Sequence, residues 1–141
     1  GGVGKTTLAR VVFEKLIDKF EICCFLENVK DAFLKGPEGL VSLQISLLSC
    51  LKIEDLAIYN RYEGMQMISR LLGEKKVLLV VDDIDYESQL DYLARSPDCF
   101  ANIPDWFGKG SRIIITTRDR NVLSSLGEER IYELKTMKND E

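Results

Sequence analysis

The first seven residues limit the possible folds of this chain more than any other segment does. They read Gly1-Gly2-Val3-Gly4-Lys5-Thr6-Thr7. Gly4, Lys5 and Thr6 match the end of the phosphate-binding pattern G-x-x-x-x-G-K-[ST], whose first glycine would lie two residues before Gly1. In that pattern, glycines let successive backbone N–H groups turn toward one phosphate, and the following helix adds the positive end of its dipole. We therefore expect a phosphate-binding loop that leads into a helix, in a chain that is a fragment of a longer protein.

These seven residues form the predicted nucleotide-binding segment. Their backbone is expected to surround the β-phosphate, while Lys5 places its charge near the β- and γ-phosphates and the Thr6 hydroxyl ligates Mg²⁺. A flexible glycine-rich segment before an ordinary helix would show the same residues, so the motif alone leaves that alternative open.

The composition limits the partners that the chain can have. Its 141 residues suffice for one domain with a substantial core, and 45% of them are hydrophobic and 30% charged. The formal charge is -4 and the basic residues are spread along the chain, which argues against a nucleic-acid partner. No apolar run approaches the roughly 18 residues of a membrane span, so no membrane partner is expected.

The cysteines do not indicate a metal site. They are Cys23, Cys24, Cys50 and Cys99, none of them in a C-x-x-C pair, and the chain has no histidine to complete a zinc site. Cys23 and Cys24 lie in an apolar run, so both are predicted to be buried in a strand. This use of cysteine suits a reducing compartment.

Apolar residues recur with helical spacing in some segments and run continuously in others. A recurrence every four residues predicts a helix from Lys5 to Phe20. Further helices are predicted over 40–51, 64–72, 87–94 and 122–126, with a loop around 36–39 and irregular structure over 97–110. Strands are predicted over 22–26, 77–81, 113–116 and 131–134. Strands that alternate with helices predict an α/β fold with a parallel, doubly wound sheet flanked by helices.

A pair of acids follows the second of these apolar runs. Val77 to Val81 is followed by Asp82-Asp83, which is the Walker B pattern of a rigid strand that ends in a carboxylate. Asp82 is predicted to contribute to the Mg²⁺ site through water, and Asp83 to orient or deprotonate the attacking water. Two adjacent acids at the end of a strand can also be a solvated turn, but this alternative loses weight downstream of a phosphate-binding motif.

A third polar group ends the strand that begins at Arg112. Thr116-Thr117-Arg118 follows the apolar run, and Arg118 is predicted to sense the γ-phosphate through a bidentate contact. The alternative is a surface arginine that pairs with Asp119.

Several motifs, in order, resemble those of the NB-ARC nucleotide-binding domain of plant disease-resistance proteins. They are Gly1-Gly2-Val3-Gly4-Lys5-Thr6-Thr7-Leu8-Ala9, Phe25-Leu26-Glu27-Asn28-Val29, Val80-Val81-Asp82-Asp83-Ile84-Asp85 and Gly110-Ser111-Arg112-Ile113-Ile114-Ile115-Thr116-Thr117-Arg118-Asp119. Asp85 at the end of the third motif resembles the receptors that carry a TIR domain, and so do Phe25–Val29 and Trp106-Phe107-Gly108. The segment over 95–105 is longer than the family usually has, which leaves the path of that loop open.

The resemblance implies a P-loop NTPase fold of the STAND/AAA type, with a strand inserted between the Walker A and Walker B strands and with the first strand truncated. It implies that residues 1–141 are the nucleotide-binding subdomain of an NB-ARC domain, incomplete at both ends. ADP or ATP with Mg²⁺ would be the ligands of an intracellular immune receptor that works as a switch in defence signalling, with slow ATP hydrolysis. TIR and leucine-rich repeat domains of the same protein would lie outside this segment. The receptor would form a homo-oligomer on activation and would be cytoplasmic or nucleocytoplasmic.

Other functions remain compatible with a phosphate-binding motif. A P-loop phosphotransferase would need an acceptor pocket and an arginine-rich lid, and no arginine-rich segment occurs. Another P-loop ATPase, acting on DNA, is disfavoured by the acidic charge. A degenerate copy without activity is disfavoured because the key side chains are intact. Turnover that depends on a small acceptor or on nucleic acid would distinguish the first two from a switch.

Overall fold

The computed structural model describes residues 2–53, 56–85 and 107–118, and the following account is confined to them. The elements, in chain order, are α1 (Gly2–Leu16), the short 3-10 helix η1 (Ile17–Lys19), β1 (Ile22–Leu26), α2 (Val29–Leu34), α3 (Pro37–Ser49), α4 (Arg61–Leu72), β2 (Val77–Ile84) and β3 (Arg112–Thr117). The helices predicted over 87–94 and 122–126, the strand predicted over 131–134 and the long loop over 95–105 lie outside these residues.

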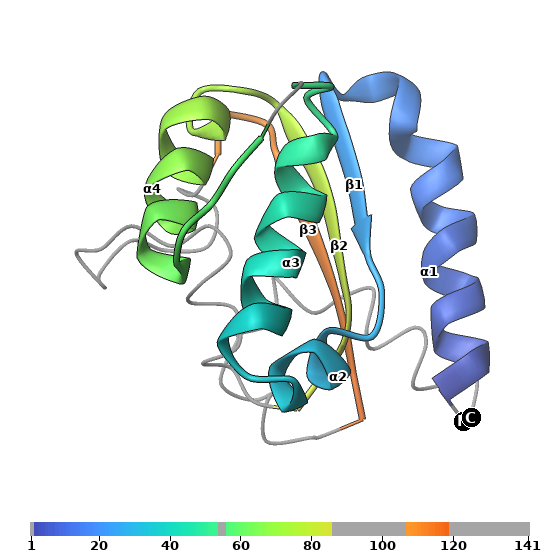
Figure 1. The fold of residues 1–141 in the computed structure, drawn as a ribbon. Helices are drawn as coiled ribbons and strands as arrows, with labels where there is room; N and C mark the ends of the chain where they lie inside the picture. The colour runs from blue at the N-terminus through green and yellow to red at the C-terminus, as the bar shows by residue number, and fades with distance from the viewer. Residues whose placement is uncertain (1, 54–55, 86–106, 119–141) are drawn as a thin grey trace.

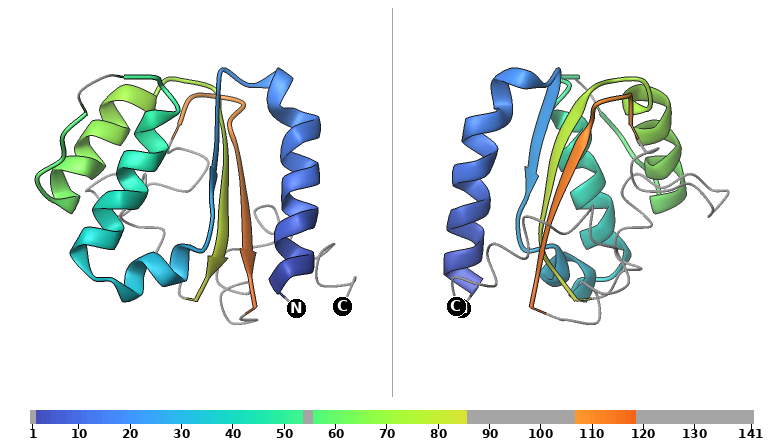
Figure 2. Two further views of the ribbon diagram at one scale, coloured as in Figure 1. Left: turned by 45° about the vertical axis from the view of Figure 1, so that its right-hand side comes forward. Right: turned by 180° about the vertical axis from the view of Figure 1, so that it is seen from behind.

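The described part of the chain is a helix–sheet–helix sandwich. The sheet has three strands in the order β1-β2-β3, and both pairs of neighbours are parallel. Helix α1 packs on one face of the sheet, and α2, α3 and α4 lie on the other (Figures 1 and 2). The N-terminal end of α1 lies at the same edge as the carboxyl ends of the strands (Figure 2). This arrangement brings the start of the chain to the ends of strands that come much later in the sequence.

The central strand has the apolar sequence that its position requires. Val77, Leu78, Leu79, Val80 and Val81 are all 0% exposed, as expected for a parallel strand covered on both faces. The register pairs Ile22 with Val77 at the start of β1 and Leu78 with Arg112 at the start of β3.

The neighbouring strand β1 has two unlike faces. Cys24 and Leu26 are buried, whereas the other three residues, Ile22, Cys23 and Phe25, are half-buried. The prediction that both cysteines are buried is therefore confirmed for Cys24 and wrong for Cys23. Successive side chains of a strand point to opposite faces, so adjacent residues meet different surroundings.

Helix α1 begins earlier than predicted. It starts at Gly2 instead of Lys5, so part of the expected loop is the first helical turn, and it ends at Leu16, with η1 in place of its last turn. The first four N–H groups of any α-helix have no acceptor within the helix. Helix α1 can therefore start at Gly2 without hydrogen-bond acceptors from upstream residues.

A helix that the sequence did not predict, α2, follows β1, and the next helix starts sooner than expected. The loop predicted around 36–39 is reduced to a turn at Gly36 (φ 75°), and Pro37 is the first residue of α3. Proline fits this position because its missing N–H would be unpaired there anyway. Gly39 is a packing glycine and not a loop residue, since a Cβ at this position would collide with the carbonyl of Ala32 in α2.

Helix α4 also starts before its predicted first residue, Gly64. Its N-cap is Asn60, whose Oδ1 accepts hydrogen bonds from the N–H groups of Tyr62 and Glu63, both at 3.0 Å.

The described residues include no helix with the combined length and apolar character that a membrane crossing requires.

Candidate functional site

A pocket of about 290 Å³ lies at the edge of the sheet where the strands end and α1 begins. It is lined by Thr6, Thr7, Glu27, Asn28, Asp82, Asp83 and Arg118. In open parallel α/β sheets, ligands bind outside the carboxyl ends of the strands. The position of the pocket therefore agrees with the place where the sequence predicts phosphate binding.

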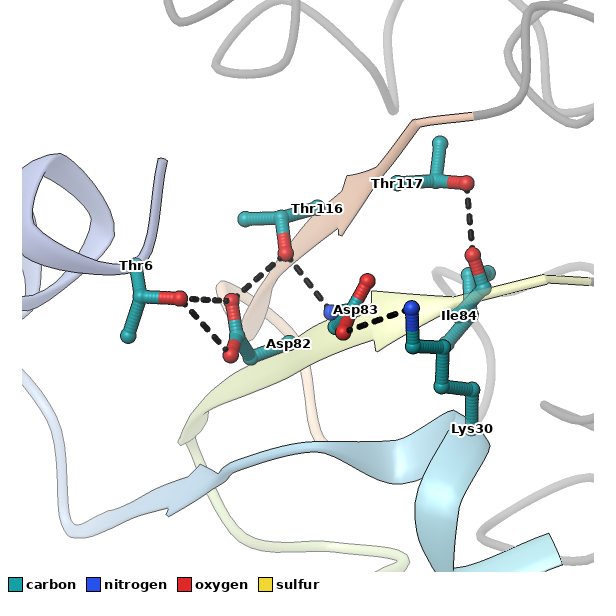
Figure 3. Close-up of polar contacts among 7 residues, drawn as sticks. All are labelled: Thr6, Lys30, Asp82, Asp83, Ile84, Thr116 and Thr117. Carbon is teal, nitrogen blue, oxygen red and sulfur yellow. Dashed lines mark hydrogen bonds and ion pairs between the residues drawn. The ribbon is translucent and has the colours of Figure 1, made fainter. Parts of the chain in front are cut away.

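Asp82 connects three elements at the floor of this pocket. The Thr6 hydroxyl of α1 lies 3.1 Å from Oδ1 and 3.0 Å from Oδ2 of Asp82, and the Thr116 hydroxyl of β3 donates to Oδ1 at 2.7 Å (Figure 3). The Asp82 residue is only 2% exposed. A buried carboxylate is costly unless hydrogen bonds compensate it, and here hydroxyls from two neighbouring elements do so.

A bulge in β2 gives the two adjacent aspartates different environments. Val81 pairs with Ile115 and Ile84 with Thr117, so Asp82 and Asp83 together stand against the single residue Thr116. Asp83 adopts a left-handed backbone (φ 66°), and its N–H donates to Oγ1 of Thr116 at 2.7 Å. Bulges of this kind redirect side chains and are common next to active sites.

Both threonines of the motif Gly110–Asp119 stabilise this bulge. Oγ1 of Thr116 accepts from Asp83 and donates to Asp82, and Oγ1 of Thr117 donates to the carbonyl of Ile84 at 2.6 Å (Figure 3). The threonine pair therefore has a structural role: it holds the end of β2, and with it both carboxylates, in one conformation.

Asp83 is paired with a cation that the sequence analysis did not predict. Nζ of Lys30 in α2 lies 3.5 Å from Oδ2 of Asp83, and the side chains are 27% and 17% exposed (Figure 3). Asp82 and Asp83 thus have different partners, hydroxyls for the first and an ammonium for the second. The only sequence signal for Lys30 is its place directly after the motif Phe25–Val29. Because the sequence does not predict α2, it does not predict that the Lys30 side chain points toward Asp83 either.

The loop after β1 is fastened to α1. Arg10 of α1 forms an ion pair with Glu27, and its guanidinium lies 4.3 Å from the centre of the Phe25 ring. The Phe25 ring also makes an edge-on contact with Phe13 of α1, with 5.5 Å between the ring centres. Asn28 follows in a left-handed conformation (φ 50°), which asparagine tolerates better than most residues. These contacts fix the wall of the pocket that Glu27 and Asn28 form.

The predicted site residues are brought together to the extent that the structure describes them. Thr6, Thr7, Asp82, Asp83 and Arg118 line one pocket, and Arg118 is exposed there. Of the other members of the first motif, Gly2, Val3, Gly4 and Lys5 form the first turn of α1, whereas Gly1 and the side chains of Val3 and Lys5 lie outside the description, as does Asp119. The functional role of each of these residues stays a prediction.

The described oxygen atoms fit a magnesium ion chemically. Mg²⁺ prefers oxygen ligands and is usually held by one or two protein groups, with water and substrate phosphates completing its shell. The Thr6 hydroxyl and the Asp82 carboxylate are in direct contact, so a cation between them would meet both kinds of oxygen.

Comparison with known proteins decides the family. The chain matches the NB-ARC domain over residues 1–141. It belongs to the NB-ARC family. It is 40% identical over 143 residues to the disease resistance protein RUN1 of Vitis rotundifolia. The matched region covers 100% of this chain and 10% of that protein. It is also 40% identical over 148 residues to the TMV resistance protein N of Nicotiana glutinosa, with coverage of 100% and 12%.

A third relative is more distant. The probable disease resistance protein RPP1 of Arabidopsis thaliana is 34% identical over 145 residues, which is 99% of this chain and 11% of that protein. The chain thus spans about a tenth of the length of these relatives. The resemblance to resistance proteins that the motifs predicted is confirmed. The predicted fold class, an α/β P-loop NTPase with a parallel sheet flanked by helices, is confirmed as well.

Proposed function

We propose that this NB-ARC chain is the nucleotide-binding subdomain of a TIR-type plant immune receptor and that it binds ADP or ATP with Mg²⁺ in the pocket at the sheet edge. The observation that carries the proposal is the hydrogen-bonded connection Thr6–Asp82–Thr116, which joins the start of α1 to the ends of two strands. The resistance-protein names of the relatives support the receptor role.

The charges of the pocket favour a phosphate group that is accompanied by a cation. Glu27, Asp82 and Asp83 line it together with the guanidinium of Arg118, so a bare phosphate would meet several carboxylates. Bound Mg²⁺ would neutralise phosphate charge there. The protein's own contribution is the free N–H groups of the first turn of α1, the predicted charge of Lys5, and the oxygen atoms of Thr6 and Asp82.

Hydrolysis would depend on the residues around the bulge. Asp83 would orient the attacking water and accept its proton, and Arg118 would stabilise the charge on the γ-phosphate. Lys30 engages Oδ2 of Asp83 and leaves Oδ1 outside that ion pair. This ion pair would hold the Asp83 side chain in one orientation for the slow hydrolysis that a switch requires.

In the proposed switch, ADP holds the receptor inactive, and its exchange for ATP permits activation and homo-oligomer formation. A nucleotide can shift this equilibrium only if the two conformations bind it with different affinities. The conformational response would be transmitted to TIR and leucine-rich repeat domains of the same protein, in the cytoplasm or in a nucleocytoplasmic pool.

Calorimetric titration with ADP, in Mg²⁺ and in EDTA, tests the binding site. Thr6→Ala should weaken Mg²⁺-dependent ADP binding by roughly tenfold or more, about 1.4 kcal/mol, because it removes a ligand of the cation. Asn60→Ala is the matched control, since Asn60 caps α4 and does not line the pocket. Equal ADP affinity of both variants in Mg²⁺ would show that the pocket is not the nucleotide site.

A further inference from the structure

Two thiols meet on the side of the sheet that α3 covers, away from the nucleotide pocket. Cys24 in β1 and Cys50 directly after α3 both donate to the carbonyl of Ser46, and each Sγ lies 3.7 Å from that oxygen. Cys24 is 3% exposed, whereas Cys50 is half-buried. Cys50 is therefore partly open to solvent, whereas Cys24 is not.

The two thiols also influence each other's ionisation across this shared carbonyl. The Cys50 side chain is the main cause that raises the pKa of the Cys24 thiol, with burial as the second cause. The Cys24 side chain in turn lowers the pKa of the Cys50 thiol below its ordinary value, although burial opposes the shift. The more accessible sulfur is thus the better thiolate, and thiolate character together with access governs the oxidation of cysteine.

Cys23 provides an internal comparison. It lies next to Cys24 in the strand but on the other face, where its thiol donates to the carbonyl of Ile17 at 3.4 Å. Burial is the main cause that raises the pKa of Cys23, followed by the charge of Cys50. Cys23 therefore has neither the lowered pKa of Cys50 nor the hydrogen bond to the Ser46 carbonyl that Cys24 and Cys50 share.

We propose that Cys24 and Cys50 form an oxidation site at which a hydroperoxide closes an intramolecular disulfide between β1 and the end of α3. The Cys50 thiolate attacks the O–O bond of the peroxide, which breaks, and Cys50 becomes a sulfenic acid while hydroxide leaves and is protonated to water. The Cys24 sulfur then attacks the Cys50 sulfur, and its proton leaves with the departing hydroxide as a second water. In sum, two thiols and one hydrogen peroxide give one disulfide and two waters.

The crosslink would close the chain segment between Cys24 and Cys50. This segment contains α2, and with it Lys30, the partner of Asp83 in the pocket. The oxidation site does not depend on the proposed nucleotide function, because its geometry involves only β1, α3 and the residue that follows α3.

The test is peptide mapping of the unmodified protein after oxidation. The reduced protein is treated with hydrogen peroxide, free thiols are blocked with N-ethylmaleimide, and the non-reduced digest is analysed by mass spectrometry. We expect a Cys24–Cys50 linkage within one chain that dithiothreitol reverses. A linkage to Cys23 or Cys99 instead, a link between chains, or conversion of Cys50 to sulfinic acid without a disulfide would overturn the proposal.

Single serine variants assign the linkage independently. Cys23→Ser should form the crosslink as the unmodified protein does, whereas Cys50→Ser should not form it. Because Cys50 is half-buried, its replacement disturbs the core less than Cys24→Ser would. An intramolecular disulfide that persists in Cys50→Ser would equally overturn the assignment.

Discussion

At the scale of single residues, two neighbouring aspartates are distinguished by their surroundings. Asp82 is buried against hydroxyls, whereas Asp83 sits on a left-handed bulge beside an ammonium. This difference agrees with the proposed division of roles, in which Asp82 contributes to the cation site and Asp83 acts on water.

Asp83→Asn tests the second role without disturbing the backbone. Asparagine is among the few residues that tolerate the left-handed conformation, so the bulge should persist. Single-turnover ATP hydrolysis should slow by roughly a hundredfold or more, the usual contribution of a general base, with ADP affinity unchanged. A hydrolysis rate equal to that of the unmodified protein would show that Asp83 is not the base. Asp83→Gly, which relieves the backbone strain, is the control for effects on stability.

The Lys30–Asp83 ion pair gives a second prediction at this scale. Lys30→Met should reduce the hydrolysis rate several-fold because Asp83 loses the contact that fixes its side chain, and Lys30→Arg should restore most of it. Affinity for ADP should not change, since Lys30 does not line the pocket. A parallel loss of ADP binding in Lys30→Met would instead assign Lys30 to nucleotide contact.

At the scale of elements, the start of β3 is tied to the start of β2 by a short hook. Gly108 N–H donates to the Lys75 carbonyl at 2.8 Å, and the Ser111 hydroxyl accepts from Val77 N–H at 2.8 Å and donates to the Gly108 carbonyl at 2.6 Å. A Cβ on Gly108 would lie 2.5 Å from the carbonyl oxygen of Glu74. Gly108, just before the motif Gly110–Asp119, and Ser111 within it thus set the register that brings Thr116 to Asp82.

Ser111→Ala should lower the free energy of unfolding by about 1–3 kcal/mol, because it leaves the buried Val77 N–H without its acceptor. Gly108→Ala should be at least as destabilising, since backbone atoms cannot move aside cheaply. Urea denaturation measures both, with the exposed neighbour variant Lys109→Ala as the control. Equal stability of Ser111→Ala and Lys109→Ala would contradict the role of the hook.

The capping of α4 is a separate element-scale prediction. Asn60→Ala removes the acceptor for two N–H groups and should cost about 1 kcal/mol, whereas Asn60→Asp should keep most of the stability. Urea denaturation of both variants checks this. If alanine and aspartate were equally stabilising, the side-chain cap would not contribute.

At the scale of the whole molecule, the sheet was predictable because its strands are continuous apolar runs. The predicted runs over 22–26, 77–81 and 113–116 all fall within observed strands. The polar residues that follow them could be placed together, because parallel strands end at one edge of a sheet. The pocket thus contains five predicted residues: Thr6, Thr7, Asp82, Asp83 and Arg118.

The rest could not be predicted for specific physical reasons. Helix α2 has only six residues, so the helical spacing of Val29, Ala32 and Phe33 covers too short a window to predict a helix. Without α2, nothing in the sequence directs Lys30 toward Asp83. The bulge has no local signature either, because its left-handed residue is an aspartate and not a glycine, and the hydroxyl that holds it comes from another strand. The pair Gly36-Pro37 predicts a loop, although proline also suits the first turn of a helix, where Pro37 lies.

Nucleotide binding at this site is tested most directly by thermal unfolding in Mg²⁺. The unmodified protein and Lys5→Ala are each measured with and without ADP. ADP at a hundredfold excess over its dissociation constant should add about 2.7 kcal/mol of stability. For a domain of this size, that raises Tm by roughly 6–11 °C. We expect this rise in Tm for the unmodified protein and its loss in Lys5→Ala. A cooperative transition that ADP does not move, or an equal rise in both proteins, would contradict nucleotide binding at this site.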